Sequence, residues 1–396
     1  MGEMVGTPRM IKLLNKDVIE GIIKVNGPIT KPEIAKLTNL SLVTVNKTVD
    51  ILVSENKVRL SDVHDSSVGR RAQYFEINEE LHYIIGLHYD CNMYIGAVSN
   101  SIGKIIFRRE FPVRVSSYGE VMEDTYSALD SLCEFCTGHE IAAIGLGVPG
   151  VVKEGVVTNI PNIPSWEGVD VAHVLEERYG APVLLENDIN LAAMGVYYGQ
   201  YKDKVDSLAL VYLEQGIGSG LILGRELFKG ATNFAGELSY LPVDWGMDGR
   251  NAVNAAGAQP AAGSDARCSG AQSAAGSDAR YNGAFEHTVI RLEEELRQSS
   301  GTRKKELKSL LRRTVANGLL SIICVINPEV VGLVCSQITR TDIKGIEELL
   351  KDCIGEEHVP KLMKLDDIRE PGIHGLIGMC IREITPTYSL SSRKRG

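Results

Sequence analysis

Short apolar runs alternate with longer amphipathic stretches from residue 84 to residue 386, and this alternation limits the fold more than any other feature of the chain. The stretch IIGLHYDCNMYIGAVSNSIGKII, residues 84–106, has the period-two pattern of two strands with a turn between them. An amphipathic helix is predicted near residues 119–137, and the apolar run IAAIGLGVPGVV follows it. Strands and helices in this order indicate a layered α/β body.

The second half of the body continues the pattern. The stretch APVLLENDINLAAMGVYYGQY predicts a strand that ends at Glu186, a polar bend at Asn187 and Asp188, and then a helix. The stretch SLALVYLEQGIGSGLIL predicts two strands around a glycine-rich turn. After Phe285 the chain is predicted to be largely helical, and ANGLLSIICVINPEVVGLV indicates a buried helix that leads into a strand.

Length and composition indicate an ordinary globular protein. A chain of 396 residues can form two or three domains with sizeable cores. It contains no apolar run of about 18 residues, and its N-terminus lacks the apolar segment of a secretory signal. The eight cysteines are scattered, as is usual in a reducing compartment. We therefore expect a cytoplasmic protein with no membrane partner.

The distribution of charge separates the first 60 residues from the rest. The whole chain has a net charge of -9, yet residues 1–60 contain nine Lys and Arg against six Asp and Glu. A basic end on an acidic body is typical of a DNA-binding head attached to an effector domain.

Helix signals in this head follow one another in a fixed order. A first helix is predicted to bury one face and to stop at Gly27-Pro28. The residues expected on that face are Ile11, Leu14, Val18, Ile22 and Ile23. Thr30 with Glu33 forms a capping box for a short second helix, and Ser41 caps a third. Val45, Val49 and Leu52 of the third helix should face inward, which predicts a helix-turn-helix.

Polar residues on the outer side of the third helix can contact bases and phosphates. The stretch KVRLSDVHDSSVGRRAQYFEIN then alternates like two strands around the polar loop 61–69, which predicts the wing of a winged helix. The expected DNA-contacting residues are Ser41, Thr44, Asn46, Lys47, Arg70 and Arg71. The alternative is a small helical cap with a surface hairpin and solvated arginines.

Several ordered stretches of the chain resemble the ROK family, which comprises sugar-responsive repressors and sugar kinases. The matching stretches are GRRAQYFEIN, GLGVPGVV, PNIPSW, LENDINLAAMGVYYG, YLEQGIGSGLIL, GATNFAGELSYLPV and INPEVVGLV. The resemblance implies an α/β protein in which an N-terminal winged helix-turn-helix precedes a two-lobed actin-like ATPase (ribonuclease H-like) fold. The domains it implies are a DNA-binding head at 1–80, lobes at 81–195 and 196–386, and a basic tail at 387–396.

The same resemblance implies a sugar site. In kinases of this family the aspartate that matches Asp188 is the general base, a role that suits a carboxylate at the end of a strand. The residues expected to contact the sugar are Asn162, Asn187, Asp188, Glu237 and Tyr240. Carboxylates and amides bind vicinal hydroxyls whether or not a phosphate is transferred. The alternative for Asp188 is a helix N-cap.

The chain departs from the family where a kinase binds ATP. The kinase motif Asp-x-Gly-Gly-Thr-Lys is replaced by the six residues 88–93, His-Tyr-Asp-Cys-Asn-Met. Glu214-Gln215-Gly216 stands in place of Gly-Thr-Gly, and Cys335-Ser336-Gln337 in place of paired glycines. Phosphoryl transfer depends on positioning and charge stabilisation, so these losses predict that the chain does not use ATP and is not an enzyme.

The chain also lacks ligands of the zinc site that the resemblance implies, and we expect no structural metal. Tyr240 occupies the position of the family histidine, and Cys268 is the only cysteine between Cys136 and Cys324, whereas zinc requires four nitrogen or sulfur ligands. A flexible insertion is predicted at 251–283, where a 13-residue segment, 257–269, repeats at 270–282.

Three hypotheses follow. The first is a repressor of carbohydrate metabolism that binds operator DNA as a homodimer or homotetramer and responds to a monosaccharide. The second is a sugar kinase with a DNA-binding appendage, which the missing phosphate-binding residues disfavour. The third is a regulator that no longer senses sugar and responds to a partner protein.

Overall fold

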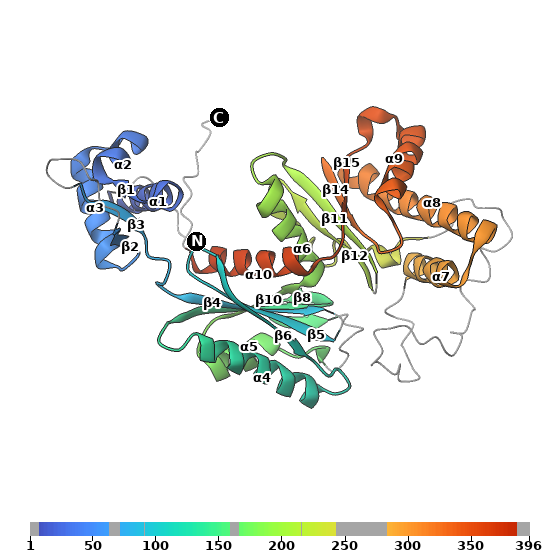
Figure 1. Cartoon of the computed structure of the whole chain (residues 1–396), viewed down its shortest axis with the longest axis horizontal. Coiled ribbons are helices and arrows are strands. Elements are labelled where there is room, and N and C mark those ends of the chain that lie inside the picture. Colours follow the sequence, from blue (N-terminus) through green and yellow to red (C-terminus); the bar gives the residue numbers. More distant parts are fainter. Residues whose placement is uncertain are drawn as a thin grey trace.

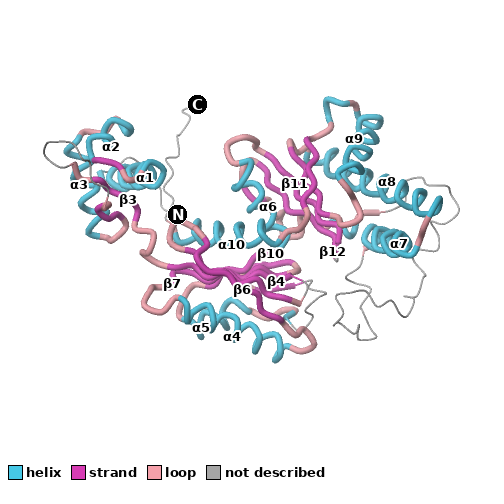
Figure 2. Tube along the Cα trace, viewed as in Figure 1, coloured by secondary structure: helices cyan, strands magenta, loops and turns pink. Residues whose placement is uncertain are grey.

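The computed structural model describes residues 8–62, 72–90, 92–158, 166–214, 216–242 and 283–385. The described chain forms a small head and two α/β lobes (Figure 1). Helices and strands alternate through both lobes, and each lobe is built around one sheet (Figure 2). The predicted basic tail and the insertion lie outside the described residues, except for Gly283, which precedes a helix.

The head consists of three helices and a three-stranded antiparallel sheet of order β1-β3-β2. Its elements are α1 (Pro8–Asn26), β1 (Ile29–Thr30), α2 (Lys31–Thr38), α3 (Leu42–Ser54), β2 (Val58–Leu60) and β3 (Tyr74–Ile77). The predicted capping box of Thr30 and Glu33 is present at α2, and the Ser41 side chain caps α3. Asn39 ends α2 with a φ of 56°, which reverses the chain between the two helices.

The buried face of α1 differs from the predicted one. Ile23 is buried as predicted, but Ile11 and Val18 are 54% and 50% exposed, and Met10 and Ile19 are buried in their place. Ile19 and Ile23 pack with Val45, Val49 and Leu52 of α3, which are buried as predicted. The apolar stripe of α1 is wider than the surface that α2 and α3 cover, so the sequence could not show which edge of the stripe is buried.

The first lobe contains a five-stranded sheet of order β10-β7-β4-β5-β6. Its strands are β4 (Tyr83–Asp90), β5 (Met93–Ser99), β6 (Ile105–Pro112), β7 (Ile141–Val148) and β10 (Val183–Asn187). The predicted hairpin is confirmed, with antiparallel pairing from β4 through β6. A short ribbon, β8 (Val151–Lys153) and β9 (Val156–Thr158), follows β7.

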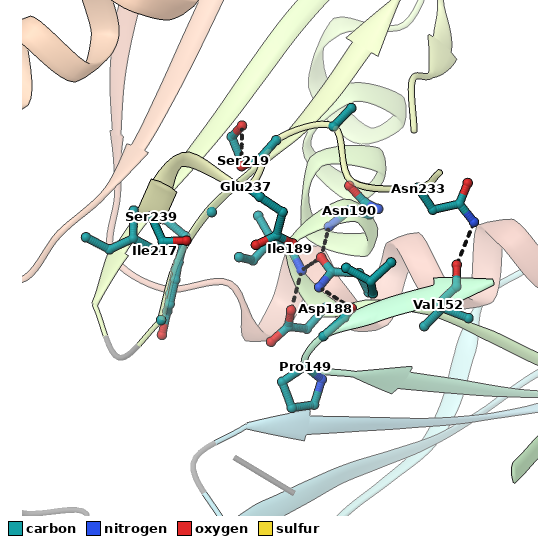
Figure 3. A pocket seen from close by; sticks show the side chains of 18 of the residues that line it. Pro149, Val152, Asp188, Ile189, Asn190, Ile217, Ser219, Asn233, Glu237 and Ser239 are labelled. Atoms are coloured by element: carbon teal, nitrogen blue, oxygen red, sulfur yellow. Dashed lines mark hydrogen bonds between the residues drawn. The ribbon is translucent and has the colours of Figure 1, made fainter. Parts of the chain in front are cut away.

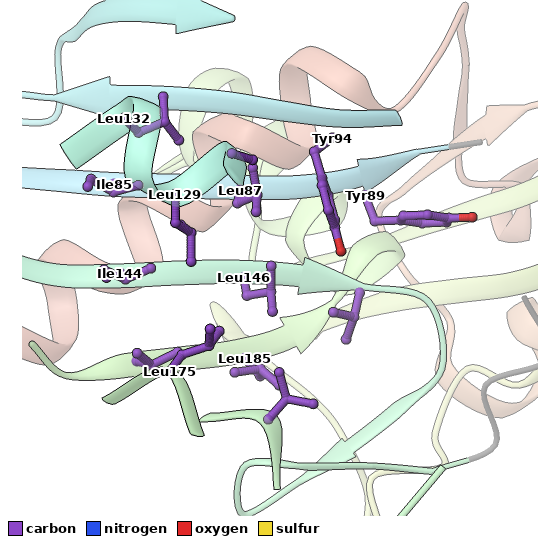
Figure 4. Close-up of a cluster of buried hydrophobic side chains, with 14 of the residues drawn as sticks. Ile85, Leu87, Tyr89, Tyr94, Leu129, Leu132, Ile144, Leu146, Leu175 and Leu185 are labelled. Atoms are coloured by element: carbon purple, nitrogen blue, oxygen red, sulfur yellow. The ribbon is translucent and has the colours of Figure 1, made fainter. Parts of the chain in front are cut away.

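Helices cover both faces of this sheet (Figure 1). On one side lie α4 (Tyr118–Phe135) and α5 (Val171–Tyr179), and on the other lies α10 (Arg369–Ile384). Leucines of α4 and α5 meet isoleucines and leucines of the strands in one fully buried cluster (Figure 4). Each such side chain contributes about 1.5–3 kcal/mol of hydrophobic free energy.

The second lobe has a sheet of order β13-β12-β11-β14-β15. Its strands are β11 (Ser207–Glu214), β12 (Gly216–Leu223), β13 (Glu226–Leu227), β14 (Val330–Val334) and β15 (Lys361–Leu365). One face packs against α7 (Ala284–Gln298), α8 (Gly301–Ile326) and α9 (Arg340–Ile354). The other packs against α6 (Asp188–Val196) and the π-helix η2 (Tyr197–Tyr201). Two 3-10 turns, η3 (Leu238–Tyr240) and η4 (Glu356–His358), complete the lobe.

Helices α6 and α10 connect the two lobes by direct backbone contact. A Cβ added to Gly195 of α6 would lie 1.9 Å from the carbonyl oxygen of Pro371, and one added to Gly375 of α10 would lie 1.9 Å from that of Leu191. No side chain separates the helices at these points, so each lobe's sheet is coupled to the other through this pair.

One described helix, α8, is long and apolar enough to cross a membrane by those two criteria alone. It buries Leu307, Leu311, Val315 and Leu319 in the core that it shares with α7 and α9. That packing is typical of the core helix of a globular domain.

Candidate functional site

A polar cavity lies where the two lobes meet (Figure 3). The first lobe contributes the turn after β7, the end of β10 and the start of α6, and the second lobe contributes β11, the start of β12, residues 233–239 and α7. Its polar lining residues are Glu186, Asn187, Asp188, Asn190, Tyr212, Ser219, Asn233, Glu237, Ser239 and Glu286.

Asn187 is the N-cap of α6. Its Oδ1 accepts hydrogen bonds from the backbone N–H groups of Ile189 and Asn190, both at 3.0 Å, and its Nδ2 donates to the carbonyl of Gly150 at 3.0 Å. The alternative prediction, that Asp188 is the N-cap of this helix, is therefore wrong, because the cap is the preceding residue. The amide of Asn187 ties the start of α6 to the turn after β7, which fixes one wall of the cavity.

Asp188 is the first residue of α6, and its Oδ1 accepts from the N–H of Ile189 at 2.8 Å. Burial raises the pKa of this carboxyl to about 7, and repulsion from Asp90 and Glu237 adds to the increase. Burial likewise raises the pKa of Glu237 to about 7. Near neutral pH both groups can accept or donate a hydrogen bond, as the recognition of hydroxyl groups requires.

Two buried carboxylates of the site were not predicted from the sequence. Glu186 accepts from the N–H of Asn187 and the Nδ2 of Asn190, both at 2.9 Å, and its other oxygen lies 2.5 Å from the Lys229 ammonium. Glu186 therefore holds the start of α6 in place.

Glu286 stands in the first turn of α7, and burial raises its pKa to about 7, with a smaller contribution from Glu237. The available signal was a glutamate on the apolar face of an amphipathic helical stretch, but the predicted insertion separates it from the rest of the site.

Three of the five predicted sugar-contacting residues line the same cavity, namely Asn187, Asp188 and Glu237. Tyr240 does not line it. Its side chain is 39% exposed, and its ring lies 5.4 Å from that of Phe234, because the turn that follows Glu237 carries it away from the cavity. Asn162 lies outside the described residues.

An ion pair is present at the stretch 88–93, which the resemblance predicted to replace the first phosphate-binding motif of a kinase. Asp90, at the end of β4, lies with its Oδ2 2.6 Å from the Nε of Arg369 at the start of α10. A carboxylate at this point repels a phosphate and already neutralises the nearby cation.

The second such stretch, around Glu214, also makes contacts within the chain. Glu214, at the end of β11, accepts a hydrogen bond from the backbone N–H of Ser336 and another from its hydroxyl at 3.2 Å. Backbone N–H groups in such turns are the donors that bind phosphate in nucleotide sites. In this chain the carboxylate of Glu214 itself occupies this backbone donor.

His88, which the resemblance matched to the first aspartate of the kinase motif, is fully buried. Neither ring nitrogen has a hydrogen-bond partner among the described residues, and burial lowers the pKa of the imidazole to about 4. The ring is therefore neutral at physiological pH. The described residues also contain no cluster of three His, Cys, Asp or Glu side chains that could hold a metal, and Tyr240 supplies no zinc nitrogen or sulfur ligand.

In the head, Ser41 and Lys47 are exposed and Thr44 and Asn46 are half-buried, all near the start of α3. The hydroxyls of Ser41 and Thr44 lie 2.9 Å apart, so both take part in the cap. Leu42 and Val43 beside them are exposed apolar residues. Arg70 and Arg71 lie outside the described residues.

Two α/β lobes with a polar cavity between them define a two-lobed actin-like protein. Residues 91–361 match the ROK family, and the chain therefore belongs to this family.

Curated relatives include repressors. The chain is 29% identical over 252 residues to the xylose repressor of Caldicellulosiruptor bescii, and this match covers 61% of this chain and 62% of the relative. It is 27% identical over 241 residues to the xylose repressor of Bacillus subtilis, covering 59% and 60%. It is 25% identical over 251 residues to the transcriptional dual regulator NagC of Escherichia coli, covering 61% and 60%. The chain thus matches less than two thirds of the length of these relatives.

Solved structures share the fold. A ROK family transcriptional regulator described as a homologue of the E. coli MLC protein matches 94% of this chain and 100% of its own, with a TM-score of 0.65 and 16% identity. A ROK hexokinase from Thermus thermophilus matches 76% of this chain and 99% of its own, with a TM-score of 0.56 and 23% identity. The regulator match extends over more of this chain than the hexokinase match does.

Proposed function

We propose that the chain is a transcriptional regulator, acting as a repressor of carbohydrate metabolism, whose affinity for operator DNA changes when a sugar binds in the cavity. One observation supports this proposal: the carboxylates and amide suited to sugar hydroxyls line one cavity, while Asp90 and Glu214, at the stretches expected to replace kinase phosphate motifs, contact Arg369 and Ser336. The site can hold a sugar but lacks the means to phosphorylate it.

The first sugar to test is D-xylose, because two relatives are named xylose repressors. In our proposal Asn187, Asp188 and Glu237 bind its hydroxyl groups. Asn162 remains a fourth candidate, from the segment after β9.

The head is proposed to be a winged helix-turn-helix that binds the operator. The order of α1, α2, α3 and the antiparallel β2–β3 pair supports this, as does the capped start of α3. Thr44 and Asn46 would contact base edges and Lys47 a phosphate, with Ser41 at the cap. Arg70 and Arg71 would enter the minor groove or contact the backbone from the wing.

Regulation requires that the sugar bind one arrangement of the lobes better than another. A coupling free energy of about 1–3 kcal/mol would change operator affinity by about 5- to 150-fold. Two heads on a homodimer or homotetramer would then be presented at a different spacing. We place the regulator in the cytoplasm without a membrane partner, with a head at 1–80, lobes at 81–195 and 196–386, and a basic tail at 387–396.

The kinase is the second candidate, favoured by the carboxyl of Asp188, whose pKa near 7 suits a general base. A glucokinase of Halalkalibacterium halodurans is also 28% identical over 37% of this chain. We expect no phosphorylation, because both stretches expected to replace kinase phosphate motifs hold carboxylates.

The experiment combines three measurements on the full chain: calorimetry with D-xylose and a panel of hexoses, binding to a duplex selected from random sequences with and without sugar, and an ATP-dependent phosphorylation assay. Sugar binding, sugar-dependent DNA affinity and no phosphorylated product are expected. ATP-dependent phosphorylation of a sugar would favour the kinase hypothesis over the regulator hypothesis. Intact DNA binding with no heat from any sugar would favour the regulator that responds to a partner protein.

A further inference from the structure

The segment between the head and the first lobe, residues 78–82, is hydrogen-bonded to both parts; we call it the linker. On the head side, the backbone N–H of Asn78 donates to the carbonyl of Lys57 and its Nδ2 donates to the carbonyl of Asn56, both at 2.9 Å. On the lobe side, the carbonyl of Asn78 accepts from the Ser101 hydroxyl at 2.9 Å. A linker bonded at both ends transmits orientation, whereas a free tether does not.

The lobe holds the linker through the turn between β5 and β6, residues 100–103, which we call the clamp. The backbone N–H of Ser101 donates to the carbonyl of Glu79 at 3.0 Å, and its hydroxyl, which shares one proton between the carbonyls of Asn78 and Glu79, lies 3.0 Å from the latter. The Nδ2 of Asn100 donates to the Glu79 carboxylate at 3.0 Å, and its Oδ1 accepts from the N–H of Lys104 at 2.9 Å. Asn100 is buried, so its hydrogen bonds to Glu79 and to Lys104 together hold its side chain in one orientation.

Helix α10 reaches the clamp with its C-terminal half. Gly103 has a φ of 90°, and a Cβ there would lie 2.7 Å from the Cδ1 of Ile381. The other end of α10 lies beside the cavity, where Arg369 pairs with Asp90. The 16 residues of α10 (Figure 1) span about 24 Å, so one helix extends from the Asp90–Arg369 pair to the clamp.

The cavity acts on α10 by two short routes. Asp90 is near enough to Asp188 to raise its pKa, so a ligand on Asp188 alters the surroundings of the Asp90–Arg369 pair. Helix α6, which begins at Asp188, touches α10 backbone to backbone at Gly195 and Gly375. A shift of α6 must therefore move α10, because no flexible side chain lies between them to absorb it.

From these contacts we infer that α10 and the clamp couple the cavity to the head, so that a ligand which moves α6 reorients the DNA-binding helices through Asn100, Ser101 and the linker. This inference rests on the proposed function for its sugar and its DNA. Asn100 and Ser101 are positioning residues, since neither lines the cavity or belongs to the head.

The functional test uses full-length Ser101→Ala and Asn100→Asp, each of which removes side-chain donors to the linker and keeps the backbone N–H of Ser101. The matched control is Ser131→Ala, because the Ser131 hydroxyl accepts a hydrogen bond from Arg109 on the outer face of the same lobe. D-Xylose and a duplex selected by the wild-type chain are the probes. The sugar-dependent change in DNA affinity should fall from at least about fivefold to less than about twofold in the two variants, with the Kd for D-xylose unchanged within about twofold.

A second measurement needs neither ligand. Hydrogen–deuterium exchange of residues 78–82 should become faster in both variants and stay at the wild-type rate in Ser131→Ala. Unchanged exchange would show that the clamp does not hold the linker, which overturns the inference. A wild-type response to D-xylose that the variants retain would also overturn it. A wild-type chain that binds no sugar or no DNA would instead overturn the proposed function, and the coupling with it. The exchange rates would still show whether the clamp holds the linker.

Discussion

The imidazole of His88 on β4 lies against the backbone of Gly372 on α10, where a Cβ would be 2.6 Å from its Nε2 atom. The same ring approaches Gly147 of β7, where a Cβ would be 2.5 Å from Nδ1. Two glycines thus make room for one neutral, fully buried histidine at the start of α10. His88 is thus part of the packing between α10 and the sheet.

Gly372→Ala should therefore destabilise the protein although alanine is the better helix former. We expect a loss of about 1–3 kcal/mol in the free energy of unfolding, because the methyl group must displace a buried ring. Gly378→Ala on the same helix is the control, since nothing lies within 4 Å of its Cβ position. That variant should be neutral or more stable by up to about 1 kcal/mol. Urea denaturation of both variants tests the pair, and equal effects would contradict the proposed role of His88.

The carboxyl of Asp188 should make stability depend on pH. Its pKa rises from an ordinary value of 3.8 to about 7 in the folded chain, mainly through burial. A raised carboxyl pKa favours folding while the group is protonated, so this contribution is complete below the unfolded pKa and disappears as the pH rises through about 7. Asp188→Asn cannot ionise at this position and should lose less stability than the wild-type chain as the pH rises, because Glu237 and Glu286 still titrate in both proteins.

We expect Asp188→Asn and the wild-type chain to have similar stability near pH 4, and the variant to be more stable by about 1–3 kcal/mol at pH 8. Denaturation curves at several pH values measure the difference. Asp352→Asn, an exposed position on α9, is the control and should follow the wild-type curve. A difference that does not change with pH would contradict the raised pKa of Asp188.

Local signals predicted much of the fold. The capping box of Thr30 and Glu33, the Ser41 cap and the apolar periodicity of α3 each depend on residues close together in the chain, and all are confirmed. The strand that ends beside Asp188 was found for the same reason, since strand alternation and a polar bend are visible in a short window.

Features set by tertiary contacts could not be predicted. Glu286 reaches the cavity only because α7 packs beside β12, and Tyr240 leaves it because of a single 3-10 turn. Which edge of α1 is buried depends on where α3 lies, so Ile11 and Val18 were assigned to the wrong side. Packing between distant segments overrode a local pattern in each case.

Lys47→Ala should weaken DNA binding by a similar factor for all sequences. An exposed lysine near the start of α3 is placed to contact a phosphate, so its loss should reduce the slope of log K against log salt by about 1. Fluorescence anisotropy at four salt concentrations measures the slope. Lys344→Ala, an exposed lysine on α9, changes the net charge equally and should leave the slope unaltered. Sugar affinity should be the same in all three proteins, and a changed affinity in Lys47→Ala would contradict the separation of the two sites.

Asp188→Ala should have the opposite effect, because this residue lies at the junction of β10 and α6 in the cavity and far along the chain from the head. Removing the carboxyl leaves the Asn187 cap of α6 intact, so the fold should survive while a sugar hydroxyl loses its partner. We expect the affinity for the sugar to fall by about ten- to a hundredfold, corresponding to the loss of one charge-assisted hydrogen bond. DNA affinity without sugar should stay within about twofold of wild type, and added sugar should no longer change it. Calorimetry and anisotropy on the same preparation measure both quantities. If Asp188→Ala lost operator binding and kept its response to sugar, the cavity would serve the head directly, and the assignment of sugar recognition to Asp188 would have to be abandoned.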